Sequence, residues 1–432
     1  MRIVVAPAGS RGDFQPLLAL SVGLRAAGHD VVLLSSPNYA AEVAAFDIPF
    51  APIGFDVEQY IRDTRMDSPL RATYQLFKVG REKIVALIDD AIPLVRGADA
   101  LIGGGAQIAG PTVAEAVGIP YLYAAYTPQA LWSSHHPPFT IPFTGLPRPL
   151  NRLSWRLSMG LVRAAFAGPL NRRRRTLGLS PVTDLYDHLF PRRASILAAD
   201  PELAPPAPDS PLAHPPTGAW HLADPRPLGA DVERFLGAGP PPVYLGFGSM
   251  PDERPDETTR IFVAAARAAG VRLILSRGWA GFGSQSGSVR GADASDNADT
   301  GDDANAPSVQ GDDLLVIGPT SHGQLFPRVA AVVHHGGAGT TAAATRAGRP
   351  QIVVPHVFDQ FQWARWAHLA GVAPPPFSRK QLSAARLSAA LKAVAGDERY
   401  RLRAAELGAT VRGRDSIAAG ISAIETLLGA LI

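Results

Sequence analysis

The stretch 332–360 constrains the fold of this chain more than any other part of its sequence. It reads VVHHGGAGTTAAATRAGRPQIVVPHVFDQ. A short β-branched run leads into glycines and threonines, an alanine-rich segment follows, and a second apolar run ends in Asp359 and Gln360. The pattern predicts a strand, a loop, a helix and a second strand. This is the repeating unit of an α/β fold built on a parallel sheet.

The loop inside this stretch has the composition of an anion site. Gly336, Gly337 and Gly339 let the backbone approach a ligand closely, and Thr340 stands at the start of the expected helix. A helix N-terminus carries free N–H groups and partial positive charge. His335, where the strand ends, can donate a ring N–H to a phosphate oxygen. Glycines alone would also suit a turn that merely caps the helix, but the string His-His-Gly-Gly-x-Gly-Thr-Thr is more specific.

The N-terminus predicts a second unit of the same kind. Residues 2–6 form an apolar strand, the string Gly-Ser-Arg-Gly-Asp at 9–13 is the turn after it, and a helix extends to Gly28 before the next strand at 31–35. In a doubly wound sheet the loop after the first strand overhangs the ligand crevice. Asp13 in this loop is either the cap of the helix or a residue with a chemical role in the crevice, and the two can coexist.

These two motifs resemble those of the GT-B glycosyltransferases of the UDP-glycosyltransferase superfamily. Ala338 stands where plant members carry a tryptophan, and Gly12-Asp13 stands where many members carry Gly-His; both features are typical of the bacterial sterol-type and glycopeptide-type branch. The resemblance implies an α/β fold with two Rossmann-like, doubly wound domains that face each other across a cleft. The C-terminal domain would bind a nucleotide sugar and the N-terminal domain the acceptor.

The resemblance also implies roles for individual residues. Asp13 matches the position of the general base, and Asp359 and Gln360 match the residues that bind the sugar hydroxyls. The nucleobase and ribose region would include Ser321, His322 and Trp279, although Trp279 is equally well explained as a buried aromatic residue. The residues implied to contact the donor diphosphate are Ser10, Arg11, Gly12, Ser249, His335, Gly337, Gly339 and Thr340.

The chemistry implied is inverting transfer of a sugar to an acceptor hydroxyl. Because a carboxylate with a pKa near 4 is a weak base for an alcohol, we expect a late, concerted proton transfer to Asp13. The His335 ring and the amides of Gly339 and Thr340 would stabilise the leaving diphosphate, so we expect no metal and no cofactor. UDP-glucose is the expected donor and co-substrate, with a TDP-deoxysugar as the alternative.

The expected acceptor site lies in the stretch 123–143, which is rich in aromatic residues, proline and histidine. We expect Trp132, His135, His136 and Phe139 to line it. Together with the apolar residues of 151–166, this stretch favours a hydrophobic acceptor such as a sterol, a lipid or a polyketide alcohol. The two histidines have no acidic or cysteine partners at the spacing of metal ligands.

The stretch 151–175 combines apolar residues with arginines and ends in the run 172–175. A basic amphipathic helix of this kind can bind a membrane surface. It can also pack its apolar face on the N-terminal domain and leave its arginines in solvent, which is the interpretation we favour.

Composition limits the remaining possibilities. The chain has 432 residues, 46% of them apolar and 18% charged, enough for two globular domains. A net charge of +3 gives no argument for nucleic-acid binding. The chain contains no cysteine, and no window approaches the roughly 20 apolar residues of a membrane span. We therefore expect a cytoplasmic protein, with peripheral membrane contact through 151–175 as a further possibility.

The predicted domain boundaries follow changes in composition. Residues 1–215 form the N-terminal domain, the proline-rich 216–241 a linker, and 242–412 the C-terminal domain, interrupted by a disordered insertion at 281–313. By resemblance, the apolar helix in 413–432 crosses back to the N-terminal domain. Two other classes of protein fit the same fold. One is a sugar-nucleotide epimerase or hydrolase, and the other is a non-catalytic auxiliary protein. The intact string His-His-Gly-Gly-x-Gly-Thr-Thr at 334–341, called the phosphate motif below, disfavours the auxiliary protein.

Overall fold

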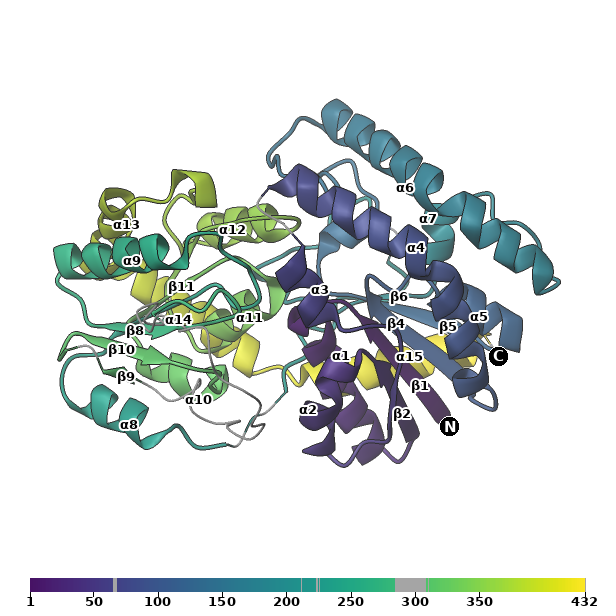
Figure 1. The fold of residues 1–432 in the computed structure, drawn as a ribbon, viewed down its shortest axis with the longest axis horizontal. Coiled ribbons are helices and arrows are strands. Elements are labelled where there is room, and N and C mark those ends of the chain that lie inside the picture. Colours follow the sequence, from purple (N-terminus) through teal and green to yellow (C-terminus); the bar gives the residue numbers. More distant parts are fainter. Residues whose placement is uncertain are drawn as a thin grey trace, which may run out of the picture.

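The computed structural model describes residues 1–64, 68–210, 212–222, 224, 226–283, 308–309 and 311–431. It contains two six-stranded sheets, one in each half of the chain, with helices on both faces of each sheet (Figure 1). The predicted pair of Rossmann-like α/β domains is confirmed.

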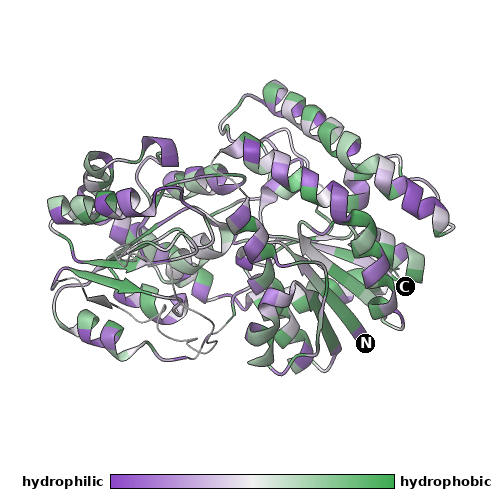
Figure 2. Ribbon diagram, in the orientation of Figure 1, coloured by the Kyte–Doolittle hydropathy of each residue, from purple (hydrophilic) through white to green (hydrophobic). Residues whose placement is uncertain are grey.

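The first sheet has the strand order β3-β2-β1-β4-β5-β6, and all its neighbouring strands are parallel. Its strands are almost continuously apolar because helices cover both faces (Figure 2). The strands are β1 Arg2–Ala8, β2 Asp30–Ser35, β3 Phe50–Pro52, β4 Ala100–Gly105, β5 Tyr121–Ala125 and β6 Ser195–Leu197. The helices of this half are α1 Arg11–Ala26, η1 Pro37–Tyr39, α2 Ala40–Ala44, α3 Val57–Asp63, α4 Pro69–Val95, α5 Gly110–Val117, η2 Pro128–Ala130, α6 Arg148–Thr176 and α7 Leu185–Leu189.

The second sheet has the order β12-β11-β7-β8-β10-β9, in which only β9 pairs antiparallel within the described residues. Its strands are β7 Val243–Gly246, β8 Leu273–Ser276, β9 Ser308–Val309, β10 Leu314–Ile317, β11 Ala331–His334 and β12 Gln351–Val353. The helices that follow in this half are α8 Ala230–Gly237, α9 Pro255–Ala269, α10 His322–Leu325, η4 Phe326–Arg328, α11 Ala338–Arg346, α12 Gln360–Leu369, η5 Arg379–Gln381, α13 Ala384–Gly396 and α14 Glu398–Arg412.

Each sheet has a topological switch point, at which successive strands stop being added on one side and are added on the other. In the first sheet it lies between β1 and β4, and in the second between β7 and β11. The loops that leave the carboxyl ends of two such strands diverge and open a crevice between them, which is where α/β sheets bind ligands. The loop after β1 carries the Gly-Ser-Arg-Gly-Asp string, and the loop after β11 carries the phosphate motif.

The last helix, α15 Ser416–Leu431, packs on the first half of the chain although it follows the second (Figure 1). It lies so close to α1 that a Cβ added at Gly23 would come within 2.3 Å of the Ile417 side chain. Ile424 and Leu428 are buried in the core of the first sheet. The glycine therefore permits the close approach of the two helices.

Both ends of the segment 216–241, predicted as a linker, are packed into cores. Trp220 is buried with the first sheet and α15, whereas Leu228 and Phe235 are buried against the second sheet. These apolar side chains fix the segment to both halves of the chain, whereas its prolines alone had suggested a linker that packs on neither.

The predicted insertion 281–313 is too wide. Phe282 is 1% exposed and packs edge-on against Phe247 and Phe262, so it belongs to the core of the second half. At the other end, Asp313 forms an ion pair with Arg267. The part of this prediction that falls on residues 284–307 and 310 lies outside the described residues.

Candidate functional site

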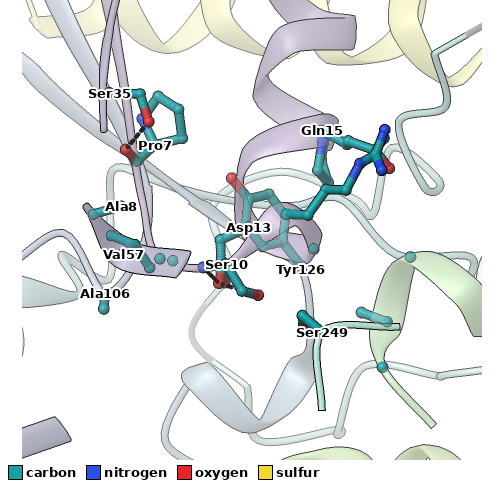
Figure 3. A pocket seen from close by; sticks show the side chains of 18 of the residues that line it. Pro7, Ala8, Ser10, Asp13, Gln15, Ser35, Val57, Ala106, Tyr126 and Ser249 are labelled. Carbon is teal, nitrogen blue, oxygen red and sulfur yellow. Dashed lines mark hydrogen bonds between the residues drawn. The ribbon is translucent and has the colours of Figure 1, made fainter. Parts of the chain in front are cut away.

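A cavity of about 1260 Å³ lies between the two halves of the chain. The loops after β1 and β4 form one wall, the loops after β7 and β11 form the facing wall, and helices α4, α5 and α6 extend it into the first half. Figure 3 shows Asp13 and Ser10 from the first half in the same cavity as Ser249 from the second.

Most of the site residues predicted from the sequence line this one cavity. They are Ser10, Arg11, Gly12, Asp13, Phe139, Ser249, Trp279, Ser321, His322, His335, Gly337, Gly339, Thr340, Asp359 and Gln360. The fold therefore brings together segments that are more than 300 residues apart in the sequence.

Asp13 is held in place by the first turn of α1. Ser10 is the N-cap of this helix, and the Asp13 Oδ2 accepts hydrogen bonds from the Ser10 backbone N–H (2.9 Å) and the Ser10 Oγ (3.2 Å). This is a reciprocal capping box, with Asp13 at its third helical position rather than at the cap itself. The carboxylate thus supports the helix start and still reaches the cavity.

The backbone around Asp13 leaves room for its carboxylate only because two neighbours are glycines. Gly9 has a φ of +133°, and a Cβ added there would lie 2.3 Å from the Asp13 Oδ2. Gly105, at the end of β4, has a φ of +68°, and a Cβ there would lie 2.8 Å from the Asp13 Cβ and 2.9 Å from its Oδ1. The two glycines follow β1 and end β4, so the Asp13 carboxylate lies at the topological switch point between these strands.

Burial raises the pKa of Asp13 to about 6, although Ser10 donates two hydrogen bonds that lower it. This corrects the expectation of a base with a pKa near 4. The surrounding chain excludes water from most of the carboxylate and disfavours its charged form. A base with a pKa closer to 7 accepts an alcohol proton more readily.

This pKa predicts the pH dependence of any reaction that uses Asp13 as a base. Because the carboxylate must be ionised, kcat/KM should fall about tenfold for each pH unit below about 6 and level off above pH 7. Initial rates measured from pH 4.5 to 8 in one buffer system, with unfolding followed by circular dichroism, test this. A rate that stays constant down to about pH 5 would contradict a base with a raised pKa.

The phosphate motif forms the N-terminus of α11, for which Gly337 is the N-cap. The first backbone bond within this helix is from the Thr341 N–H to the Gly337 carbonyl. Within the part of the chain that the structure describes, the N–H groups of Ala338, Gly339 and Thr340 are therefore available to a ligand. A Cβ added at Gly339 would meet nothing within 4 Å, which means that this residue faces open space. The arrangement is that of an anion site at a helix N-terminus.

His335 lies between two glycines from different loops. A Cβ at Gly337 would come within 2.4 Å of the His335 Nε2, and one at Gly248 within 3.4 Å of its Cε1. The Nδ1 is buried without a hydrogen-bond partner among the described residues. Burial holds the pKa of His335 well below its usual value, helped by His334 and His356, so the ring is neutral. It can donate one N–H into the cavity.

The neighbouring His334 has a structural role. Its Nδ1 accepts a hydrogen bond from the Gly336 N–H (3.0 Å), so its Nε2 donates to the Gln351 Oε1 (2.9 Å). Gln351 in turn donates to Thr345 of α11 (3.0 Å). This chain of hydrogen bonds connects β11, β12 and α11 and fixes the loop between them.

Asp359 is the N-cap of α12 and Gln360 is the first residue of this helix, directly after the loop that leaves β12. The Asp359 Oδ2 accepts a hydrogen bond from the Trp363 Nε1 (2.9 Å), and burial raises the pKa of Asp359 to about 7. The Gln360 Oε1 is already bound to the backbone N–H groups of His356 and Val357 (2.8 and 3.0 Å). Gln360 therefore holds the loop, and Asp359 carries the freer polar atoms.

The loop between β12 and α12 is also strained. Phe358, which lines the cavity, has a φ of +52°, a conformation that a phenylalanine rarely adopts. Its ring contacts Phe139 from the first half edge-on, with ring centroids 6.3 Å apart. The strain places an aromatic contact across the cavity next to Asp359.

The region expected to hold the nucleobase contains both open and occupied groups. Trp279 is half-buried and lines the cavity. The His322 ring stacks on Phe326 (4.3 Å) and its Nε2 lies 3.3 Å from the Tyr244 hydroxyl, so this side chain is packed rather than free in solvent. Burial lowers the pKa of His322 to about 3.

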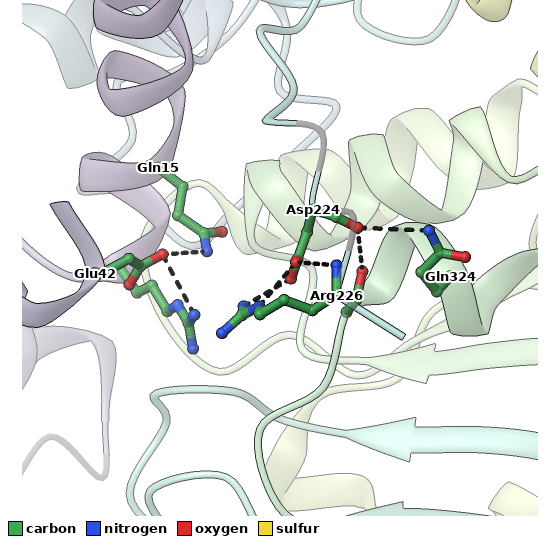
Figure 4. A network of polar contacts seen from close by, with 7 residues as sticks. Gln15, Glu42, Asp224, Arg226 and Gln324 are labelled. Atoms are coloured by element: carbon green, nitrogen blue, oxygen red, sulfur yellow. Dashed lines mark hydrogen bonds and ion pairs between the residues drawn. The ribbon is translucent and has the colours of Figure 1, made fainter. Parts of the chain in front are cut away.

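Two separate groups of polar contacts, one from each half of the chain, face each other at the cavity (Figure 4). Glu42 Oε1 accepts hydrogen bonds from Gln15 (3.1 Å) and Arg11 (3.4 Å) of α1. Facing it, Arg226 binds Asp224 through two nitrogens, and the Asp224 carbonyl lies near Gln324 of α10. The Arg11 Nε is buried without a partner among the described residues. Glu42 thus holds the Arg11 guanidinium at the edge of the cavity.

Three residues predicted for the acceptor region do not line the cavity: Trp132, His135 and His136. The loop that carries them is turned the other way because Asp209 binds Ser133 and Ser134 through three hydrogen bonds. The His136 carbonyl accepts a bond from the Trp155 Nε1 (2.9 Å). This loop supports α6 rather than a ligand.

The apolar wall of the cavity comes largely from elements that the sequence did not identify as functional. Besides α6, which was expected, helices α3, α4 and α5 contribute side chains. They include Val57, Tyr60, Phe77, Leu87 and Val113, and Ile108 from the loop before α5 lines the same wall. The partly buried apolar positions along α4 were the available signal, but their period does not distinguish a core face from a ligand-facing one.

Among the described residues, no group of three or more histidine, aspartate or glutamate side chains is arranged to hold a metal ion. In the same residues no helix is both long and apolar enough to cross a membrane.

Two family models match this chain. Residues 3–133 match the model of the glycosyltransferase family 28 N-terminal domain. Residues 311–418 match the model of the erythromycin biosynthesis protein CIII-like C-terminal domain. The two matched regions carry the Asp13 loop and the phosphate motif respectively.

Several characterised proteins are similar in sequence. Vancomycin aglycone glucosyltransferase of Amycolatopsis orientalis is 38% identical over 371 residues, which cover 84% of this chain and 83% of that protein. The dTDP-epi-vancosaminyltransferase of the same organism is 35% identical, covering 83% and 80%. Sterol 3-beta-glucosyltransferase of Cryptococcus neoformans is 32% identical over 98% of this chain, which spans only 27% of that protein.

Solved structures share the fold at lower identity. Glycosyltransferase VinC in complex with dTDP has a TM-score of 0.67 at 17% identity, with all of both chains covered. Glycosyltransferase SsfS6 of Streptomyces sp. SF2575, complexed with thymidine diphosphate, has a TM-score of 0.62 at 22% identity and covers 99% of both chains.

Proposed function

Because this chain is a GT-B glycosyltransferase whose relatives include glycopeptide and sterol glycosyltransferases, we propose that it transfers a hexose from a nucleoside diphosphate sugar to a hydroxyl of an apolar small molecule. One observation carries the proposal. A partly buried carboxylate from the first half, Asp13, and a helix N-terminus from the second half that can bind an anion, around His335 and Gly339, line the same cavity. An acceptor hydroxyl and a sugar diphosphate can therefore meet between them.

In the proposed reaction Asp13 accepts the proton of the acceptor hydroxyl. The hydroxyl oxygen attacks the anomeric carbon of the sugar while the bond from that carbon to the β-phosphate oxygen breaks on the opposite face. This inverts the anomeric centre. Proton transfer by a positioned base of this kind contributes about 10²–10⁴-fold to the rate.

The leaving diphosphate gains negative charge as the bond breaks. The N–H groups of Gly339 and Thr340 and the neutral His335 ring are fixed donors at this place, with Ser10, Arg11, Gly12, Gly337 and Ser249 around them. Donors aimed at a developing charge in a site with little water stabilise it strongly. In this proposal they act without a metal ion or a cofactor.

UDP-glucose is the first donor that we propose. Asp359 can accept hydrogen bonds from the equatorial hydroxyls of glucose, and one relative is a glucosyltransferase by name. A TDP-deoxysugar is the second candidate, because another relative is named dTDP-epi-vancosaminyltransferase. Trp279, Ser321 and His322 line the cavity and are the residues that we propose to contact the pyrimidine of either donor.

The acceptor is proposed to be a sterol, a lipid or a polyketide alcohol. The support is the apolar wall formed by α3, α4, α5 and α6, which is much larger than a polar acceptor requires. Phe139 and Trp155 add aromatic surface on the same side.

Donor binding and product formation test the proposal in one series. We expect UDP-glucose to raise the Tm of the protein more than other nucleotide sugars, including TDP-sugars. Incubation with UDP-glucose and a panel of sterols, lipid alcohols and polyketides should then give a product heavier by one hexose in mass spectrometry. A Tm shift with TDP-sugars only would reject the UDP donor, and exclusive glycosylation of polar sugars would reject the apolar acceptor. Release of free or epimerised sugar without a glycoside would indicate a hydrolase or an epimerase instead.

A further inference from the structure

Helix α6 is apolar on two faces. Its inner face packs on the first half of the chain through Trp155, Phe166 and Leu170, as the packing interpretation of 151–175 predicts. Its outer face nevertheless carries a row of leucines that are 49–60% exposed: Leu150, Leu153, Leu157 and Leu161. At about 100° per residue these four fall within an arc of about 80°. A packed surface helix has no need of this second apolar row.

Arginines flank the leucine row. Arg152, Arg156 and Arg163 are exposed and fall within an arc of about 40° on one side of it. The 29 residues of α6 include eight arginines and no acidic residue. Arg173 and Arg174 are ion-paired with Asp89 and Glu115. The arginines that form no ion pair with a described residue are Arg148, Arg152, Arg156, Arg163, Arg172 and Arg175.

The position of α6 limits what can cover this face. The helix is about 43 Å long and forms the outer edge of the first half, with α4 beneath it (Figure 1). The face therefore lies on the outside of the molecule, where a deformable surface can reach it along its whole length. The arginines favour an anionic partner. The exposed leucines favour a partner with an apolar layer beneath its charged surface.

We propose that the outer face of α6 binds the surface of an anionic lipid bilayer. Leu150, Leu153, Leu157 and Leu161 enter the boundary between headgroups and acyl chains, and the flanking arginines bind lipid phosphates. The exposed Phe143, shortly before the helix, adds one more apolar side chain at its N-terminal end. The attachment is peripheral.

The inner face of the same helix belongs to the cavity wall, which Trp155, Ser158, Val162 and Phe166 help to line. One helix thus separates the proposed bilayer surface from the proposed acceptor site. An apolar acceptor dissolved in the bilayer would be close to the cavity. This last consequence rests on the proposed function, whereas the binding of lipid does not.

Vesicle sedimentation tests the proposal without donor or acceptor, so its result is independent of any transferase activity. The probes are vesicles of equal parts phosphatidylglycerol and phosphatidylcholine, and vesicles of pure phosphatidylcholine. We expect the full-length protein to bind the anionic vesicles and not the zwitterionic ones. Binding should weaken as the salt concentration rises from about 0.1 to about 1 M, which shortens the Debye length from about 10 to about 3 Å.

Two double variants separate the contributions of charge and apolar surface. Arg152→Gln/Arg156→Gln should weaken binding about 25-fold, or about fivefold for each arginine near an anionic surface. Leu153→Gln/Leu157→Gln should weaken it by about tenfold or more. The matched control is Leu402→Gln/Arg386→Gln, which changes the same residue types at exposed positions of α14 and α13 and should bind like the unchanged protein.

All four side chains of α6 in these variants are exposed, so the Tm should stay nearly unchanged. Failure of the unchanged protein to bind anionic vesicles at low salt overturns the proposal. Equal vesicle binding by the leucine variant and the unchanged protein also overturns it. That result would mean that α6 binds polyanions through its charge alone. An acidic protein partner would then explain the binding as well as a bilayer does.

Discussion

Replacement of Asp13 by asparagine is expected to lower kcat by about 10²–10⁴-fold while leaving the Kd for UDP nearly unchanged. The amide oxygen of asparagine can still accept the Ser10 N–H that Asp13 accepts now, so the start of α1 and the shape of the cavity are retained. Only the ability to take a proton is lost. Initial rates with saturating donor and isothermal titration with UDP give the two quantities.

Glu58→Gln is the matched control for this variant. It makes the same chemical change at another carboxylate that lines the cavity and should change kcat by less than about tenfold. Near-normal turnover by a folded Asp13→Asn protein would mean that Asp13 only caps α1 and does not act as the base. The base would then have to be sought at Asp359, because His135 and His136 do not line the cavity.

Replacement of His335 by alanine should instead weaken UDP binding by about 1–3 kcal/mol, which is the value of one hydrogen bond to a charged group. This corresponds to about 5–150-fold in Kd. Transfer should slow as well, because the same donor would stabilise the charge that develops on the diphosphate. Isothermal titration with UDP and initial rates of transfer measure both effects.

His335→Gln keeps an N–H donor in the side chain and should recover part of the lost affinity. His136→Ala removes another buried histidine that does not line the cavity and serves as the control for a general loss of packing. An unchanged Kd for UDP in a folded His335→Ala protein would place the diphosphate elsewhere. The two variants should therefore be distinguishable. Asp13→Asn should lower kcat alone, whereas His335→Ala should both raise the Kd for UDP and lower kcat.

The local parts of the site could be predicted from the sequence. An apolar run, a glycine loop and the start of a helix are formed by neighbouring residues, and their periodicity and backbone chemistry depend on those residues alone. His335, Gly337, Gly339 and Thr340 were recognised for this reason, as was the Ser10–Asp13 turn. The same argument located β1, α1 and β2 in the first half, β11, α11 and β12 in the second, and the helices in 151–175 and 413–432. The motifs identified the family.

Other features depended on residues that are distant in the sequence. The raised pKa of Asp13 comes from burial in a place where Gly105, about 90 residues away in the sequence, approaches it closely. The proposed acceptor wall requires α3, α4 and α5 to converge on α6. Asp209 turns His135 and His136 away from the cavity, and Phe282 joins a core that its glycine-rich surroundings did not suggest.

The sequence by itself determined which groups are available: a carboxylate after the first strand, an imidazole and free amides before α11, and a helix rich in leucine and arginine. Only the tertiary structure decided which of them share a cavity, which are desolvated, and that α6 exposes a leucine row to solvent. The physical reason is that backbone chemistry and periodicity are local properties, whereas burial, and the pKa shifts it causes, are properties of the whole packed chain.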